Sequence, residues 1–253
     1  MKQRDTSWNK VAGWYGKKVG DSGHFYHEQT ILPLLKKYLE ENNVRKLLDL
    51  GCGQGVVERV FVGEEYVGVD LSSSLLSQAQ RSKKNVKSRF VHADASKSLP
   101  IKDTDFDCAV SVLALQNIEN YEGVINNFAK HVKKGGSLVL VLNHPYYRIP
   151  RASGWMVLQG NSKQVRWISD YLKVKRIPIT MNPGAKGRRQ TVTWSFHVPL
   201  SYYIKSLSQN GFYVDGLEEL VSSKESVGKF ANRENIAREE IPLFMFITAK
   251  KVN

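Results

Sequence analysis

The amino-acid sequence predicts an α/β fold with a doubly wound, mostly parallel sheet. Short apolar runs alternate with amphipathic helical stretches from residue 44 onward. The first apolar run leads directly into a glycine-rich turn at 51–55, and the second ends on Asp70. Strands that alternate with helices need crossover connections, and these connections produce a parallel sheet.

The first half of the chain contains five predicted strands and the helices that connect them. Apolar runs predict strands at 46–50, 66–70, 88–92, 106–112 and 137–143. Helical spacing predicts helices near 56–61, 73–84 and 121–134. The last of these helices is expected to stop at Gly135-Gly136, because glycine readily takes the left-handed conformation that ends a helix.

After the fifth strand the alternation breaks. Two β-like runs, 175–180 and 191–196, flank a turn-rich stretch and predict a hairpin. The regular pattern then resumes with a helix at 200–209, a strand at 212–220, a helical connection at 223–240 and a last strand at 243–249.

These patterns divide the chain into three parts. Residues 1–43 are expected to form an N-terminal helical cap, with apolar positions such as Trp8, Val11, Trp14 and Tyr15. Residues 44–143 and 199–253 are expected to form a catalytic domain, and 144–198 an inserted basic, aromatic lid beyond the carboxyl edge of the sheet.

The positive charge of the chain is concentrated in the insertion. The 253 residues carry 37 Lys and Arg against 24 Asp and Glu, a formal charge of +13. Residues 144–198 hold ten basic residues and one acid, Asp170, so they contribute 10 − 1 = +9 of that excess. Such a field attracts nucleic acid, an anionic membrane surface or an acidic small molecule, although a merely solvated basic face is the alternative.

Several protein classes are disfavoured by what the sequence lacks. No secretory signal and no apolar run of membrane-spanning length are found, so no membrane partner is expected. The two cysteines, Cys52 and Cys108, do not suggest a disulfide framework and favour a cytoplasmic location. No spacing of histidine, cysteine and carboxylate residues suggests a metal site.

The glycine-rich turn indicates nucleotide binding. The stretch 47–55 reads LLDLGCGQG, an apolar strand that runs into glycines where the backbone can approach a ligand closely. Asp70 follows Gly51 by nineteen residues, at the place where such folds put the carboxylate that binds ribose hydroxyls. Position 56 is Val56, so the glycine spacing of the pyridine dinucleotide fingerprint is absent.

With Asp49 before it, the turn resembles the first motif, D-x-G-x-G-x-G, of the class I S-adenosylmethionine-dependent methyltransferases of the small-molecule type. The resemblance implies a Rossmann-like methyltransferase fold with seven strands, the last of them reversed. It also implies S-adenosyl-L-methionine as cofactor. It assigns cofactor contacts to Asp49, Gly51, Gly53, Gly55, Asp70, Leu71, Asp94, Ala95 and Val112.

Acceptor contacts are expected just past the fifth strand, at the sheet edge where ligands bind in this fold. His144 is the candidate general base, with a structural histidine as the alternative. Tyr146, Tyr147, Arg148 and Arg151 are the candidate acceptor contacts. His24 and His27 could close over the cofactor or could serve packing alone.

Two departures from the family pattern bear on the methylation chemistry that we expect. Gln116-Asn117 stands where many small-molecule members carry a histidine after strand four. The run 143–146, NHPY, resembles the Asn-Pro-Pro-Tyr signature of enzymes that methylate exocyclic or amide nitrogens, but it follows strand five instead of strand four. We therefore do not expect that chemistry.

The sequence leaves three functional hypotheses. The favoured one is in-line methyl transfer to a small anionic or aromatic acceptor, since arginines and aromatic rings can hold a planar or carboxylated molecule. The first alternative is an RNA methyltransferase, in which the basic insertion would hold phosphates and stack bases. The second is a non-catalytic partner subunit that binds the cofactor.

Overall fold

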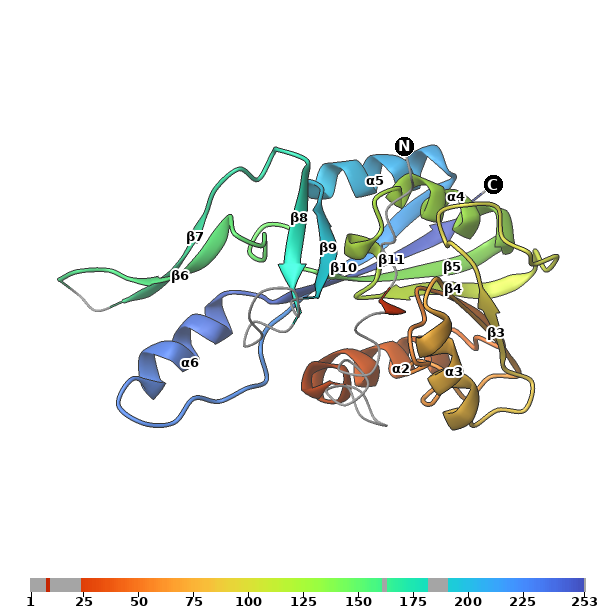
Figure 1. The fold of residues 1–253 in the computed structure, drawn as a ribbon, viewed down its shortest axis with the longest axis horizontal. Helices are drawn as coiled ribbons and strands as arrows, with labels where there is room; N and C mark the ends of the chain where they lie inside the picture. The colour runs from red at the N-terminus through yellow and green to blue at the C-terminus, as the bar shows by residue number, and fades with distance from the viewer. Residues whose placement is uncertain (1–7, 10–23, 161–162, 182–190, 253) are drawn as a thin grey trace.

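A seven-stranded sheet forms the centre of the structure, a computed structural model that describes residues 8–9, 24–160, 163–181 and 191–252 (Figure 1). The strand order is β10-β11-β5-β4-β1-β2-β3. The five strands from β1 to β5 run parallel, and β11 runs antiparallel to both β5 and β10. The strands are β1 Lys46–Leu50, β2 Glu65–Asp70, β3 Arg89–His92, β4 Phe106–Val112, β5 Val132–Asn143, β10 Phe212–Leu220 and β11 Phe244–Lys251. The predicted doubly wound α/β fold and its reversed last strand are confirmed.

Helices cover both faces of this sheet, and each face has its own apolar core. α4 and α5 pack on one face through residues such as Phe128 and Leu207, whereas α2 packs on the other through Leu35 and Leu39. The described helices are η2 His27–Ile31, α2 Leu32–Glu41, α3 Ser73–Ser82, η3 Leu115–Asn117, α4 Tyr121–His131, α5 Leu200–Gln209 and α6 Ala231–Glu240. In the N-terminal cap, Val11, Trp14 and Tyr15 lie outside the described residues.

The predicted helix at 56–61 is wrong, because the chain there forms consecutive turns. One helical bond is present, from the Phe61 N–H to the Val57 carbonyl at 3.0 Å. The run is short, rich in β-branched valines, and closed by Gly63, where a Cβ would lie 2.8 Å from the Val44 carbonyl oxygen. The chain must therefore turn back toward β2 before a regular helix can form.

The expected helix stop at Gly135-Gly136 is also wrong, since α4 ends at His131 and β5 begins at Val132. Val132 already pairs with Phe106 of β4, and the register shifts after that pair. A Cβ on Gly136 would lie 2.9 Å from the Asp107 carbonyl oxygen. Gly136 therefore serves a close strand approach instead of a helix end, whereas Gly135 takes a left-handed conformation within the strand, with a φ of +75°.

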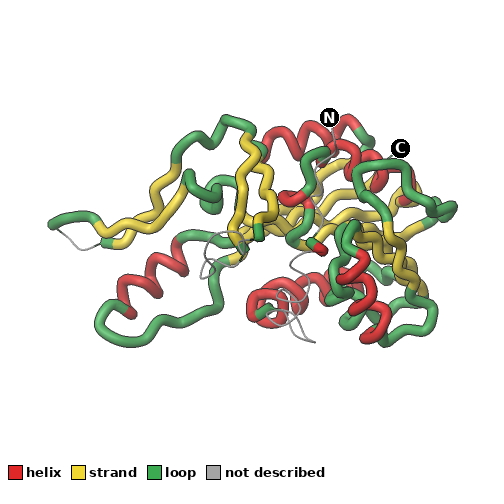
Figure 2. Tube along the Cα trace, in the orientation of Figure 1, coloured by secondary structure: helices red, strands yellow, loops and turns green. Residues whose placement is uncertain are grey.

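The insertion contains the predicted hairpin and a second one. β8 Lys175–Thr180 pairs with β9 Val192–His197, as expected, and β6 Ser153–Val157 pairs with β7 Gln164–Ile168. Figure 2 shows β6 and β7 extending away from the central sheet, with α6 beneath them. The sequence did not predict β6 and β7, because each short strand places apolar residues on both faces instead of alternating them with polar residues. The helical connection predicted at 223–240 becomes regular only at Ala231.

No helix in the described part of the chain is long and apolar enough to cross a bilayer.

Asn127 on α4 couples this helix to the loop after β3. Its side-chain amide donates to the carbonyl oxygens of Ala95 and Lys97 at 2.8 and 2.7 Å, and the residue is buried. We expect Asn127→Leu to lower the free energy of unfolding by about 2–4 kcal/mol, because two carbonyl groups lose their donor. The measurement is urea denaturation, with the exposed neighbour Asn126→Leu as the matched control. Equal stability of the two variants would contradict this role.

Candidate active site at the carboxyl edge of the sheet

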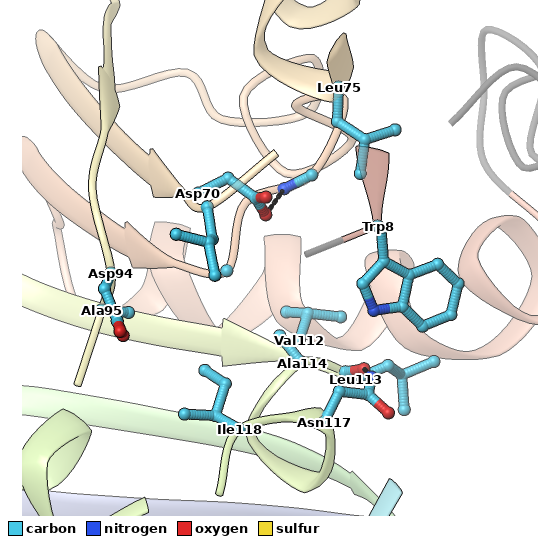
Figure 3. Close-up of a pocket in the computed structure, with 13 residues that line it drawn as sticks. Trp8, Asp70, Leu75, Asp94, Ala95, Val112, Leu113, Ala114, Asn117 and Ile118 are labelled. Atoms are coloured by element: carbon cyan, nitrogen blue, oxygen red, sulfur yellow. Dashed lines mark hydrogen bonds between the residues drawn. The ribbon is translucent and has the colours of Figure 1, made fainter. Parts of the chain in front are cut away.

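A pocket lies where β1, β2 and β4 end, on the edge at which the chain order reverses between β1 and β4 (Figure 3). This is the ligand-binding position of open α/β sheets. Seven of the nine predicted cofactor contacts are among the residues that line it. The lining residues are Trp8, Gly51, Gly53, Asp70, Leu71, Leu75, Asp94, Ala95, Val112, Leu113, Ala114, Asn117 and Ile118.

The turn after β1 can be built only with glycine at its key positions. Gly51 and Gly53 have φ angles of +85° and +54°, in the region that favours glycine. A Cβ on Gly51 would lie 2.3 Å from the Cβ of Ala114, so any side chain would push the turn away from the end of β4. The missing side chains bring the backbone of β1 and β4 together beside the pocket.

Asp70 connects the turn to the end of β2. One carboxylate oxygen accepts a hydrogen bond from the Gly53 N–H at 2.8 Å, and the other accepts from the Ser72 N–H at 2.7 Å. Burial raises the pKa of Asp70 above its ordinary value. A carboxylate has about four lone-pair sites, so both oxygens retain capacity to accept from hydroxyl groups in the pocket.

Asp49 and Gly55, the other two predicted contacts, lie behind the turn and do not line the pocket. Asp49 is 1% exposed and accepts a hydrogen bond of 2.6 Å from the Tyr66 hydroxyl. Burial raises the pKa of Asp49 to about 7. Gly55, at φ +79°, packs closely against Ala79 and Phe90, so both residues support the turn from below.

Leu113 marks the end of β4 with an unusual backbone conformation, a φ of +52°. Its N–H donates to the Val141 carbonyl at 2.8 Å, and its carbonyl accepts from the side-chain amides of Gln116 and Asn117 at 2.8 and 3.1 Å. A leucine with positive φ is strained and persists only where its surroundings hold it in place. Gln116 and Asn117, which stand where many members of the resembled family carry a histidine, therefore hold Leu113 in place at the pocket.

Trp8 was predicted only as an apolar position of the N-terminal cap, yet it lines the pocket. The adjacent Asn9 anchors it, because its side-chain oxygen accepts from the Ser72 hydroxyl at 2.8 Å and the Ser74 N–H at 3.2 Å. No local pattern could have revealed this contact, since Asn9 and Ser72 lie 63 positions apart in the sequence.

A second hollow adjoins the first and shares Trp8, Leu113 and Asn117 with it. Its volume of about 500 Å³ falls within the range of small-molecule sites. Among the described residues, no Asp or Glu lines it. The remaining lining residues are His24, Tyr26, His27, Gln116, Asn143, Arg148, Pro150, Ile179, Met181, Thr193, Ser195 and Phe244.

Arg148 brings a positive charge to this hollow. Its guanidinium carbon lies 5.1 Å from the centroid of the Phe244 ring, and no carboxylate pairs with it in the described ranges. Burial lowers the pKa of Arg148, although a guanidinium stays charged at neutral pH. A half-buried cation without an acidic partner is suited to bind an anionic ligand.

The other predicted acceptor residues do not line either space. His144 is fully buried, with Nε2 2.7 Å from the Glu219 carboxylate and Nδ1 accepting from the Tyr146 N–H at 3.3 Å. Burial lowers the pKa of His144. Both ring nitrogens of His144 are thus engaged within the protein.

The two tyrosines serve the insertion itself, and Arg151 lies at its surface. The Tyr146 ring stacks on Tyr171 at 4.2 Å, and the Tyr147 carbonyl accepts from Arg166 Nε at 2.7 Å. Arg151 is exposed, with φ +62°, in the turn before β6.

Comparison with known proteins agrees with this geometry. The family described as "Methyltransferase domain" matches residues 48–140. A crystal structure of an S-adenosylmethionine-dependent methyltransferase from Mesorhizobium loti is 26% identical, with a TM-score of 0.67, and the match covers 86% of this chain and 96% of that one.

Two groups of curated relatives add acceptor names. A malonyl-[acyl-carrier protein] O-methyltransferase of Bacillus cereus is 27% identical over 85% of this chain and 79% of its own length. A demethylmenaquinone methyltransferase of Tropheryma whipplei is 32% identical, but over 40% of this chain and 43% of its own length. The fold, the pocket at the sheet edge and these similarities together identify the chain as a class I S-adenosylmethionine-dependent methyltransferase.

Proposed function

We propose that S-adenosylmethionine binds in the first pocket and that a small anionic acceptor binds in the second hollow. The observation that carries this proposal is the wall shared by the two spaces, formed by Trp8, Leu113 and Asn117. Because the two spaces adjoin at these residues, an acceptor atom in the hollow can approach a methyl group held in the first pocket.

The residues of the first pocket fit the chemistry of the cofactor. The free lone pairs of Asp70 suit two ribose hydroxyls, and the turn around Gly53 leaves room for a ligand beside its backbone. Apolar Leu71 and Ile118 offer flat contact for a purine ring, with the Asp94 carboxylate near enough to line the same pocket. The cofactor supplies the activated methyl carbon, and the protein supplies orientation, worth about 7–11 kcal/mol of the barrier.

The second hollow supports the anionic acceptor. Arg148 can donate two parallel hydrogen bonds to a carboxylate, and the lack of acids in the described lining leaves its charge available. Its size suits a small molecule or a small group on a carrier better than a splayed RNA strand. The name of the Bacillus cereus relative, which gives a malonyl group as acceptor, is compatible with a carboxylated substrate.

Asp70 provides the test of the cofactor site. We expect Asp70→Ala to weaken S-adenosylmethionine binding by about 10- to 100-fold, because hydrogen bonds to a charged group are lost. Isothermal titration calorimetry measures the dissociation constant. Asp105→Ala is the matched control, since Asp105 pairs with Lys46 on the surface and does not line the pocket. Unchanged affinity in Asp70→Ala would remove this residue from the site.

Arg148 provides the test of the acceptor site. We expect Arg148→Met to reduce methyl transfer to small acidic metabolites at least about tenfold while cofactor affinity stays the same, because the charged partner is lost. The assay follows label from the cofactor into the products formed from the acidic small-molecule fraction of a cell extract. Arg45→Met is the control, because Arg45 forms an exposed ion pair with Glu64.

Three results would contradict this assignment: equal loss in both variants, loss of cofactor binding in Arg148→Met, or label that enters RNA with a steep salt dependence. The last of these would favour the RNA alternative.

A further inference from the structure

His27 is a buried histidine on the wall of the second hollow, 6% exposed. Its ring Nδ1 accepts a hydrogen bond from the backbone N–H of His24 at 3.2 Å, and the backbone N–H of His27 donates to the His24 carbonyl at 2.6 Å. An Nδ1 that accepts carries no proton, so the neutral ring must carry its proton on Nε2. The local backbone thus holds His27 as a hydrogen-bond donor.

The neutral form of this ring persists at physiological pH. Burial, with a smaller contribution from His24, lowers the pKa of His27 to about 4. Since Nδ1 is occupied by a backbone donor, the ring offers the hollow an N–H group and no lone pair. His27 can therefore position an oxygen atom but is poorly suited to remove a proton from a substrate.

Arg148, which also lines the hollow, can only donate hydrogen bonds. The described lining contains no Asp, Glu or Lys, and the Tyr26 hydroxyl shares a hydrogen bond with Ser222 at 3.2 Å. The hollow thus combines a cation and a fixed neutral donor, and His24 is the remaining described lining residue with an imidazole ring. Among the described lining residues, an acceptor that must lose a proton during the reaction would depend on His24 alone.

We infer that the acceptor is a carboxylate that enters already ionised, and that the product is its methyl ester. This inference rests on the proposed function and specifies its substrate class. A carboxylic acid with an ordinary pKa of about 4 is ionised at neutral pH, whereas an alcohol or an amide nitrogen would need a base. A carboxylate also has two oxygens, so Arg148 and His27 can hold the group while lone pairs remain for attack.

The reaction balances without a proton transfer. A lone pair of the carboxylate oxygen forms the bond to the methyl carbon while the carbon–sulfur bond breaks, and the electrons of that bond stay on sulfur. The negative charge of the carboxylate and the positive charge of the sulfonium are both lost, giving a neutral ester and a thioether. Such charge neutralisation is favourable in a site shielded from water.

The first experiment examines the chemistry of the product. The full-length protein is incubated with methyl-labelled S-adenosylmethionine and the acidic small-molecule fraction of a cell extract, and the products are then treated with mild alkali. We expect the label to be released as volatile methanol, because alkali hydrolyses methyl esters. Label that stays bound to a small molecule after alkali would overturn the ester and leave the proposed function intact. Label found only in RNA, or in no fraction, would contradict the proposed function itself.

The second experiment examines the role of His27. We expect His27→Ala to lower kcat/KM for the labelled acidic fraction by about 10- to 100-fold with unchanged cofactor affinity, because a donor to a charged group is lost. His27→Gln, which retains an N–H donor, should recover a substantial part of that loss. A role in packing alone would not predict rescue by glutamine.

Protonation provides the remaining readouts. In the ligand-free protein, nitrogen NMR of ¹⁵N-histidine should show His27 with its proton on Nε2 at pH 7. The profile of kcat/KM against pH should be flat between about pH 6 and 8, because a carboxylate needs no base there. A decline of kcat/KM toward acid pH that disappears in His24→Gln or His27→Gln would show a histidine base and overturn the inference.

Discussion

The hydrogen bond from the Gly53 N–H to the Asp70 carboxylate is the contact on which the site depends. It joins the turn after β1 to the end of β2, two neighbouring parallel strands whose carboxyl ends lie on one edge of the sheet. It holds the turn in a conformation that glycine adopts easily, and the other carboxylate oxygen of Asp70 accepts from the Ser72 N–H. Gly53 and Asp70 both lie within the part of the chain that matches the methyltransferase family, and both line the pocket.

The wall at the end of β4 has a comparable importance for the acceptor. Leu113 is held in a strained conformation by the Val141 carbonyl and by the amides of Gln116 and Asn117. Leu113 lines both spaces, so in the proposed function backbone geometry would set the distance between a bound methyl group and an acceptor. Methyl transfer profits most from such positioning, and a missing catalytic histidine after β4 is consistent with it.

The insertion contributes less ligand surface than its composition suggests. Arg176 lies over Trp194 at 4.2 Å, Arg166 lies over Trp155 at 5.2 Å, and Tyr146 stacks on Tyr171. These pairs show that many of its basic and aromatic residues pack on one another. Of the insertion arginines that the structure describes, Arg148 alone reaches the hollow beside the cofactor pocket. Among the described residues, the large charge excess of the insertion thus contributes one cation to the lining of the hollow.

The sequence by itself determined the parallel strands of the sheet's first half, the glycine turn and the carboxylate that closes β2, because these features depend on periodicity and short spacings. It could not determine which distant side chains meet. His144 fits the pattern of a catalytic histidine, yet the fold turns it toward Glu219. His27, more than a hundred residues earlier, lines the same hollow as Arg148. Likewise Asp49 belongs to the motif but lies behind the turn, and Trp8 belongs to no motif but lines the pocket. Local rules place residues on elements, and only the packing of those elements decides which side chains share a site.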